Sequence, residues 1–156
     1  MRGEKEVLEA LAAAGLTPTV HRFGRGTETA LSSARELGVD ISRIVKSLVF
    51  SAQGDPVLAL LPGDRRADAR AVAEAMGVRK VRLADPDKVL QWSGFPVGAV
   101  PPIGHQRKLP ILMDEAIPRE GDIYPAAGES NNAFRTTFDE LRTLTGARVC
   151  RISRGE

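Results

Sequence analysis

Hydrophobic and polar residues alternate along this chain with two different periods. Apolar residues three or four positions apart predict helices over residues 7–14, 29–37, 67–76, 85–92 and 138–145. Short apolar or alternating segments predict strands over residues 19–23, 44–50, 56–61, 80–83, 109–114, 123–128, 133–136 and 148–152. Several strands are joined by connections of hairpin length, which favours antiparallel pairing over a doubly wound sheet. The pattern therefore predicts an α+β fold with a curved, mixed, largely antiparallel sheet surrounded by helices.

Glycine, proline and capping residues mark the ends of these elements. Gly24-Arg25-Gly26 predicts a turn, and Gln53-Gly54-Asp55 predicts a hairpin between the strands on either side. Thr137 and Glu140 are spaced as a capping box for the last helix. Residues 94–105 contain too many glycines and prolines for a plain helix or strand, so we expect a shaped loop there.

The strand Ile44–Phe50 has a lysine among large apolar residues. With a period of two, Lys46 shares a face with Ile44, Leu48 and Phe50. An ammonium group removed from water costs free energy unless an anion or hydrogen-bond acceptors meet it. Two interpretations follow. Lys46 is an edge-strand charge that opposes aggregation, or its face opens into a cavity that accepts a negatively charged ligand.

Composition narrows the class of protein only moderately. The chain has 156 residues, 42% hydrophobic and 27% charged, which fits one globular domain over residues 1–156. The net charge of +2 permits a nucleic-acid partner without requiring one, and 4% aromatic residues are few for a base-stacking platform. A single cysteine allows no intrachain disulfide, which fits a cytoplasmic location, and no apolar segment predicts a membrane span or a signal peptide.

The side chains that commonly carry catalysis or bind metal are scarce. Two histidines, His21 and His105, and one distant cysteine do not match a zinc site, and no phosphate-binding or dinucleotide-binding glycine motif is present. We therefore expect no metal and no cofactor. What remains is Lys46, a loop from Gly98 to Gly104 followed by His105, and the loop Gly128–Asn132. This set suits electrostatic holding combined with backbone N–H donors.

Each of these features also has a plain structural interpretation. The Gly98–Gly104 loop, stiffened by Pro101 and Pro102, could be a rigid turn between packed elements. Residues 128–132 read equally as a solvent-exposed turn. His105 and His21 fit structural histidines.

Three motifs in order resemble one family: Ile44-Val45-Lys46-Ser47-Leu48-Val49-Phe50, the G-x-x-x-P loop Gly98–Pro102 with Gly104-His105, and Ala126-Ala127-Gly128 followed by Asn132-Ala133-Phe134-Arg135. They resemble the YbaK/EbsC-type aminoacyl-tRNA deacylases, which are related to the editing domain of bacterial prolyl-tRNA synthetases. The resemblance covers nearly the whole chain. It implies a barrel-like curved mixed sheet and hydrolysis of the ester that joins a wrong amino acid to the 3′ end of tRNA.

The resemblance also implies roles for individual residues. Lys46 would hold the terminal nucleotide, and Gly98 would help to place substrate and water. The remaining candidate substrate-binding residues are Pro102, Gly104, His105, Gly128, Ser130 and Asn131. Glu129 and Ser130 stand where members of the family vary, and Ile44, Leu48, Phe50 and Val97 are candidates for the apolar wall.

The sequence therefore predicts a trans-editing hydrolase, most simply one that removes Ala or Cys from tRNA-Pro. Its partner is aminoacyl-tRNA, and prolyl-tRNA synthetase is a further candidate partner, while the oligomeric state stays open. Two other functions compete: a tRNA-binding or partner-binding module without chemistry, and a hydrolase of a small ester that is not tRNA. The scattered basic residues that either contact tRNA or belong to an ordinary solvated surface are Arg65, Arg66, Arg70, Arg79, Lys80, Arg82, Arg107 and Lys108.

Overall fold

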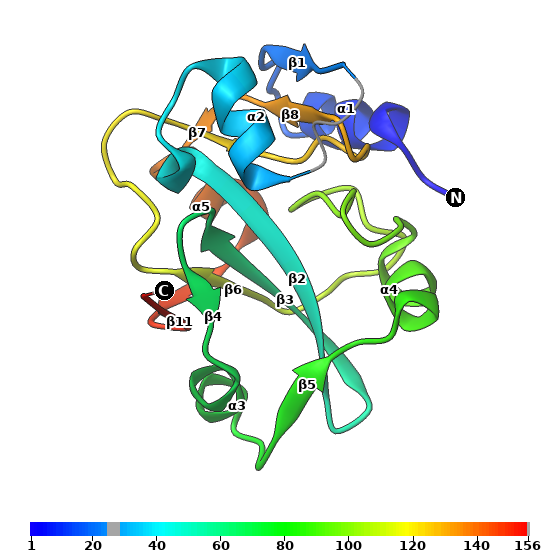
Figure 1. Ribbon diagram of the computed structural model, residues 1–156. Coiled ribbons are helices and arrows are strands. Elements are labelled where there is room, and N and C mark those ends of the chain that lie inside the picture. Colours follow the sequence, from blue (N-terminus) through cyan, green and yellow to red (C-terminus); the bar gives the residue numbers. More distant parts are fainter. Residues whose placement is uncertain (25–28, 156) are drawn as a thin grey trace.

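The computed structural model describes residues 1–24 and 29–155, so most of the predicted Gly24-Arg25-Gly26 turn lies outside the described residues (Figure 1). The helices are α1 (Glu4–Ala13), α2 (Ala30–Leu37), the 3-10 turn η1 (Ile41–Arg43), α3 (Ala69–Met76), α4 (Pro86–Ser93) and α5 (Phe138–Thr145). The strands are β1 (Val20–Arg22), β2 (Ile44–Ala52), β3 (Asp55–Pro62), β4 (Arg66–Ala67), β5 (Val81–Leu83), β6 (Ile111–Asp114), β7 (Asp122–Pro125), β8 (Asn132–Phe134), β9 (Thr136–Thr137), β10 (Arg148–Cys150) and β11 (Ser153–Arg154).

A seven-stranded mixed sheet organises the molecule. Its strand order is β10-β6-β3-β2-β7-β9, and β5 pairs with the far end of β2. The long hairpin β2–β3 is antiparallel with a two-residue turn at Gln53-Gly54, whereas β6 and β7 join it in parallel. Two small antiparallel sheets, β1–β8 and β4–β11, lie outside this path. Figure 1 shows β2 and β3 crossing the centre of a strongly curved sheet with helices around it. The predicted α+β class is confirmed.

Capping residues that the sequence indicates are found at the starts of three helices. Thr29 accepts a hydrogen bond from Ser32 N at the start of α2, and Thr137 accepts one from Glu140 N at the start of α5. Pro86 occupies the first turn of α4. Among the described residues, no helix combines the length and the apolar character that crossing a membrane requires.

Both faces of the sheet are covered, and each cover forms its own hydrophobic cluster. The larger cluster joins α1, α4 and α5 to one face and includes Val45, Val49 and Phe95. The smaller cluster lies between α3 and the other face and includes Phe50 and Leu61. The central strands β2 and β3 are therefore fixed from both sides, which is what a rigid site on them needs.

The edge of β2 that faces β7 and β5 is interrupted. Strand β7 pairs with β2 at Ile44 and Val45, and β5 pairs with it from Phe50 to Ala52. Ala84 N, which follows β5, donates to Val49 O, the residue of β2 next to this paired segment. Among the described residues no strand pairs with this edge at positions 46–48. Lys46 therefore lies on the interrupted part of a strand that is otherwise paired.

The predicted elements are found with boundaries shifted by a few residues. The sequence did not predict the short strands β4, β9 and β11. These strands have two residues each and form through pairing with distant segments, so they carry no periodic signal of their own.

Candidate functional site

A cavity of about 250 Å³ opens at the interrupted edge of β2. Its floor is formed by residues Ile44 to Leu48, which come from both faces of the strand because the cavity wraps around the edge. One wall comes from the loop after α4 with Val97, Gly98 and Val100. Tyr124, the loop before β8 and the first turn of α2 also line the cavity. Apolar side chains make up most of these walls.

The structure brings together three of the predicted site residues. Lys46, Gly98 and Ser130 all line the cavity, although they come from three separate segments. Of the predicted apolar wall, Ile44, Leu48 and Val97 line it, while Phe50 packs in the cluster under α3. The other predicted residues, which do not line the cavity, are Pro102, Gly104, His105, Gly128 and Asn131. Several of them support the two loops.

Lys46 is half-buried, and its ammonium group is held from the side. Lys46 Nζ donates to the main-chain carbonyl of Arg65 at 2.5 Å. Arg65 Nε in turn donates to Ser153 Oγ at 2.7 Å, and Ser153 Oγ donates to Asp114 Oδ2 at 2.6 Å. The carbonyl that orients the lysine thus belongs to a residue that is itself tied to the interior.

Asp114 anchors this network. Its side chain is fully buried, and Asp114 Oδ1 accepts from Ile152 N at 2.8 Å. Asp114 Oδ2 accepts from Ala116 N at 3.2 Å in addition to Ser153 Oγ. A buried carboxylate with this many donors is well satisfied. The pairing of β11 with β4 brings Ser153 to this position.

His105 supports the Gly98 loop. His105 Nε2 donates to Pro101 O at 2.6 Å, and its ring meets Phe95 edge-on with centroids 6.3 Å apart. Burial of the imidazole lowers the pKa of His105 below its usual value, so the neutral ring is favoured. Gly98 has a φ of +89° with no atom within 4 Å of where a Cβ would lie. Its backbone is therefore exposed beside the cavity in a conformation that side chains disfavour.

Asn132 supports the opposite loop. Its Oδ1 accepts from Ala127 N and Glu129 N, each at 3.0 Å, and its Nδ2 donates to Ala127 O and to Glu4 Oε1, each at 3.1 Å. Gly128 packs so closely on α1 that a Cβ would lie 2.7 Å from Gly3 C. The loop that carries Ser130 is thereby fixed in the protein rather than free in solvent.

Sequence reasoning did not select several residues that line the cavity, and Tyr124 and Ser47 are two of them. Tyr124 lines it and contacts His21 edge-on at 5.8 Å. Ser47 lines it too, and its Oγ is buried without a hydrogen-bond partner among the described residues. A buried unpaired hydroxyl is uncommon and costs free energy. In a strand, Ser47 points to the face opposite Lys46, so the sequence pattern did not place both residues in one site. Both line the cavity because it extends around the edge of β2.

The electrostatics of the cavity centre on Lys46. The other ionisable residues in its lining are Tyr124 and Glu129. Glu129 Oε2 accepts from Glu4 N at 2.9 Å, so this carboxylate caps the start of α1. The arrangement offers one oriented cation, a hydroxyl, an exposed glycine backbone and apolar walls. It can bind a ligand that is anionic at one end and small and apolar at the other.

Comparison with known proteins shows the family to which the chain belongs. Residues 25–144 match the family model described as the aminoacyl-tRNA editing domain. The chain belongs to the aminoacyl-tRNA editing domain family. The predicted YbaK/EbsC-type relationship is therefore confirmed.

Relatives of full length and a solved structure cover most of the chain. "Uncharacterized protein YwhH" of Bacillus subtilis is 31% identical over 83% of both chains. The Enterococcus faecalis protein named "Putative Cys-tRNA(Pro)/Cys-tRNA(Cys) deacylase EbsC" is 27% identical over 82% of this chain and 79% of its own. A crystal structure described as "a putative trans-editing enzyme for prolyl tRNA synthetase" matches with a TM-score of 0.92 and 34% identity over 97% of both chains.

Larger proteins share the same domain. The proline–tRNA ligase of Nitratidesulfovibrio vulgaris strain DP4 is 34% identical over 80% of this chain. This chain spans only 24% of that ligase's length. The likeness therefore concerns one domain of the ligase and not its other activities.

Proposed function

We propose that this protein hydrolyses mischarged aminoacyl-tRNA in trans, with tRNA-Pro carrying Ala or Cys as the substrate. The observation that carries the proposal is the meeting of Lys46, Gly98 and Ser130 around one cavity at the edge of β2. The family match, and the names of the relatives that mention tRNA(Pro) or prolyl tRNA synthetase, support the same substrate class.

Lys46 takes the role of holding the 3′-terminal nucleotide through phosphate. An ammonium group is a compact point charge, and the contact with Arg65 O directs it along the cavity edge. The terminal ribose then lies over Ser47 and the aminoacyl group lies between the two loops. Exposed backbone at Gly98 is the donor that we assign to the oxyanion.

The chemistry is addition of water to the ester carbonyl, followed by cleavage of the bond to the ribose oxygen, which leaves as a hydroxyl. One well-placed oxyanion donor contributes roughly 2.7–4 kcal/mol to such a step. Holding water and ester together contributes a further entropic term. Because Glu129 already caps α1, we assign assistance of the attacking water to the free hydroxyl of the substrate's own terminal ribose.

The size of the cavity favours a small aminoacyl group. Its volume of about 250 Å³ lies below the range of about 300–1,000 Å³ that is usual for drug-sized ligands. Discrimination would come from exclusion of larger side chains, because preferring one methylene contributes only about 1–3 kcal/mol. Ile44, Leu48 and Val97 are the residues that we assign to this exclusion.

The test is the substitution Lys46→Ala, assayed by release of labelled amino acid from Ala-tRNA-Pro and Cys-tRNA-Pro. We expect hydrolysis to fall by about 100-fold or more, because a phosphate contact and its orientation are lost together. The free energy of unfolding should change by no more than about 1 kcal/mol, because removal of a half-buried charge offsets loss of the hydrogen bond to Arg65 O.

Lys5→Ala is the matched control, since Lys5 is an exposed lysine on α1 that pairs with Glu9 at 3.9 Å. It should keep the parent's activity. Full hydrolysis by the Lys46→Ala variant would refute the assigned role. A parent protein that binds these tRNAs tightly without hydrolysing any of them would instead support a binding module.

A further inference from the structure

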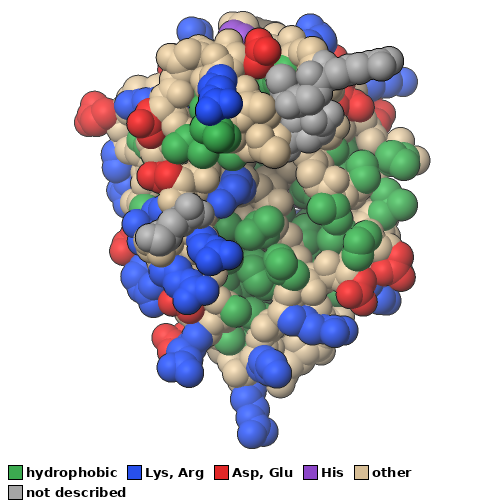
Figure 2. Space-filling model, in the orientation of Figure 1, with side chains coloured by type: hydrophobic (Ala, Val, Ile, Leu, Met, Phe, Trp, Pro, Cys, Tyr) green, Lys and Arg blue, Asp and Glu red, His purple; other side chains and the backbone are tan. Residues whose placement is uncertain are grey.

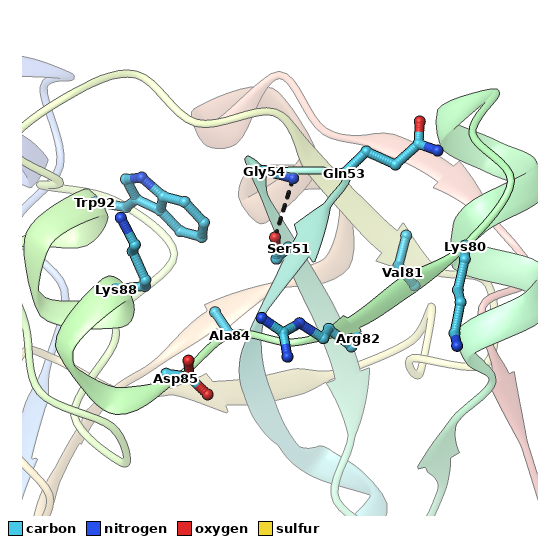
Figure 3. Close-up of a pocket in the computed structure, with 10 residues that line it drawn as sticks. All are labelled: Ser51, Gln53, Gly54, Lys80, Val81, Arg82, Ala84, Asp85, Lys88 and Trp92. Atoms are coloured by element: carbon cyan, nitrogen blue, oxygen red, sulfur yellow. Dashed lines mark hydrogen bonds between the residues drawn. The ribbon is translucent and has the colours of Figure 1, made fainter.

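A second cavity lies farther along β2, beyond the candidate site. It has a volume of about 460 Å³ and lies between the β2–β3 hairpin, strand β5 and the start of α4. Figure 3 shows Arg82 extending along β5 toward Ala84 and α4, and Lys88 extending from α4 beside the indole of Trp92. Lys80 points away from the middle of this group. None of these residues was needed to describe the first cavity.

The cations of this second cavity are exposed, and protein groups satisfy them only weakly. Among the residues that the structure describes, neither Lys80 nor Arg82 forms an ion pair or a side-chain hydrogen bond. Lys88 Nζ donates to Gln91 Oε1 at 3.3 Å and lies 5.8 Å from the centre of the Trp92 ring. Asp85 is the one carboxylate in the lining and is outnumbered by three cations. The cavity is therefore an unneutralised basic surface.

The two cavities lie along one strand of the same sheet. The first takes residues 44–48 of β2 and the second takes Ser51 and the turn at Gln53-Gly54. At about 3.3 Å per residue, Lys46 and Ser51 are roughly 16 Å apart along β2. Figure 2 shows an apolar hollow on this face with Lys and Arg side chains gathered along its left and lower edges. A ligand chain that leaves the first cavity along β2 reaches Arg82 and Lys88.

We propose that the second cavity, through Arg82 and Lys88, binds the sugar-phosphate backbone of the tRNA strand that leads to the 3′ end. This inference rests on the proposed function, because the 3′ end must occupy the first cavity. Exposed lysine and arginine side chains on a concave surface are the groups that neutralise successive phosphates.

The contact is to phosphates and not to bases. Trp92 is only 6% exposed, so its ring face offers no platform on which a base could stack. Gly54 N already donates to Ser51 Oγ at 3.2 Å, which takes up a backbone donor that could otherwise have contacted a base edge. Binding here adds affinity and direction to the strand without reading its sequence.

The experiment compares the parent with the double variant Arg82→Ala/Lys88→Ala. Binding of an uncharged tRNA-Pro transcript is measured by fluorescence anisotropy across a salt titration. Each lost phosphate contact should lower affinity about 5-fold at 0.1 M salt and reduce the slope of log K against log salt by about 0.7. We therefore expect a loss of about 25-fold and a slope that is shallower by about 1.4.

Lys5→Ala/Arg142→Ala is the control, because it removes the same number of positive charges from α1 and α5, neither of which lines the second cavity. It should leave the slope within about 0.3 of the parent. A variant at Arg82 and Lys88 with the parent's slope would overturn the inference. So would an equal loss in the control, because net charge alone would then explain binding.

Measurements of hydrolysis distinguish failure of this inference from failure of the proposed function. The ratio of kcat/KM for mischarged full-length tRNA to that for an aminoacylated 3′-CCA fragment should fall at least 5-fold in the Arg82→Ala/Lys88→Ala variant. An unchanged ratio in an active protein overturns the inference and leaves the proposed function standing. A parent that hydrolyses neither substrate overturns the proposed function, while the binding slopes still test the basic surface.

Discussion

The two cavities along β2 differ in how their polar groups are held. In the first cavity, the lysine contacts Arg65 O, and the two loops are supported by His105 and Asn132. In the second, Arg82 and Lys88 stand on the surface with little to fix them. The first arrangement suits a reaction, in which donors must already be in place when charge develops. The second suits attraction of a flexible anionic strand, which tolerates mobile cations.

The two cavities also differ in how their polar groups affect the stability of the protein. The first has a buried hydroxyl at Ser47 that finds no partner within the described part of the chain, and two loops that are held by hydrogen bonds of His105 and Asn132. The second consists of solvated side chains, which contribute little to stability. We therefore expect substitutions of the side chains that support the first cavity, Asn132 and Ser153, to lower stability and activity together, and substitutions around the second cavity to change binding alone.

The largest effect on stability is expected at Asn132, which supports one loop of the first cavity. Asn132→Ala removes four hydrogen bonds and leaves Ala127 N and O buried without them. We expect the free energy of unfolding to fall by about 3–4 kcal/mol, measured by urea denaturation. Hydrolysis should fall as well, because the loop that carries Ser130 loses its support.

Asn131 provides the matched control next in sequence. Asn131→Ala removes one side-chain hydrogen bond, to Phe23 O at 3.1 Å, and should cost about 1 kcal/mol. Equal losses of stability from the two alanine variants would show that Asn132 does not hold the loop as described.

A smaller effect on stability is expected at Ser153, where activity is the informative measurement. Ser153→Ala breaks the links from Arg65 to Asp114 and should cost about 2–3 kcal/mol, because both hydrogen bonds involve a charged group. Since Arg65 O orients Lys46, kcat/KM should also fall by about 10-fold.

Thr145→Ala is the control that distinguishes a positioning role of Ser153 from a loss of stability alone. Thr145 Oγ1 donates to Leu141 O at 2.8 Å on α5, without any link to Lys46. This variant should lose stability and keep the parent's kcat/KM at a temperature where both proteins are folded. An equal loss of activity in both variants would exclude a positioning role for Ser153.

The smallest effect, and one of opposite sign, is expected at Ser47. Ser47→Ala removes a buried hydroxyl that has no partner among the described residues, so the protein should become more stable by up to about 1 kcal/mol. The value of kcat/KM should fall, because we place the terminal ribose of the substrate over Ser47. A stabilised variant with unchanged kcat/KM would remove Ser47 from the site.

Local pattern predicted most of the fold and the floor of the first cavity. Lys46 stood out because one charge interrupts an apolar strand, and the Gly98 and Gly128 loops stood out through their glycines. The supports could not be predicted, because Asp114, Ser153 and Asn132 reach their partners only through the folded sheet. Asn131 and Asn132 are chemically identical in the sequence, yet only Asn132 is buried beneath the loop. His105 was recognised, but its contact with Pro101 O depends on how the loop folds.

The link between Arg65 and Ser153 has a consequence for synthesis of the chain. Ser153 lies 88 positions after Arg65, so a ribosome makes it long after the hairpin that carries Lys46. Strands β2 and β3 can pair early because they are adjacent in sequence. Arg65, whose carbonyl orients the Lys46 ammonium group, becomes linked to Asp114 when β11 has emerged and paired with β4. A nascent chain therefore carries Lys46 without this support until translation has passed that strand.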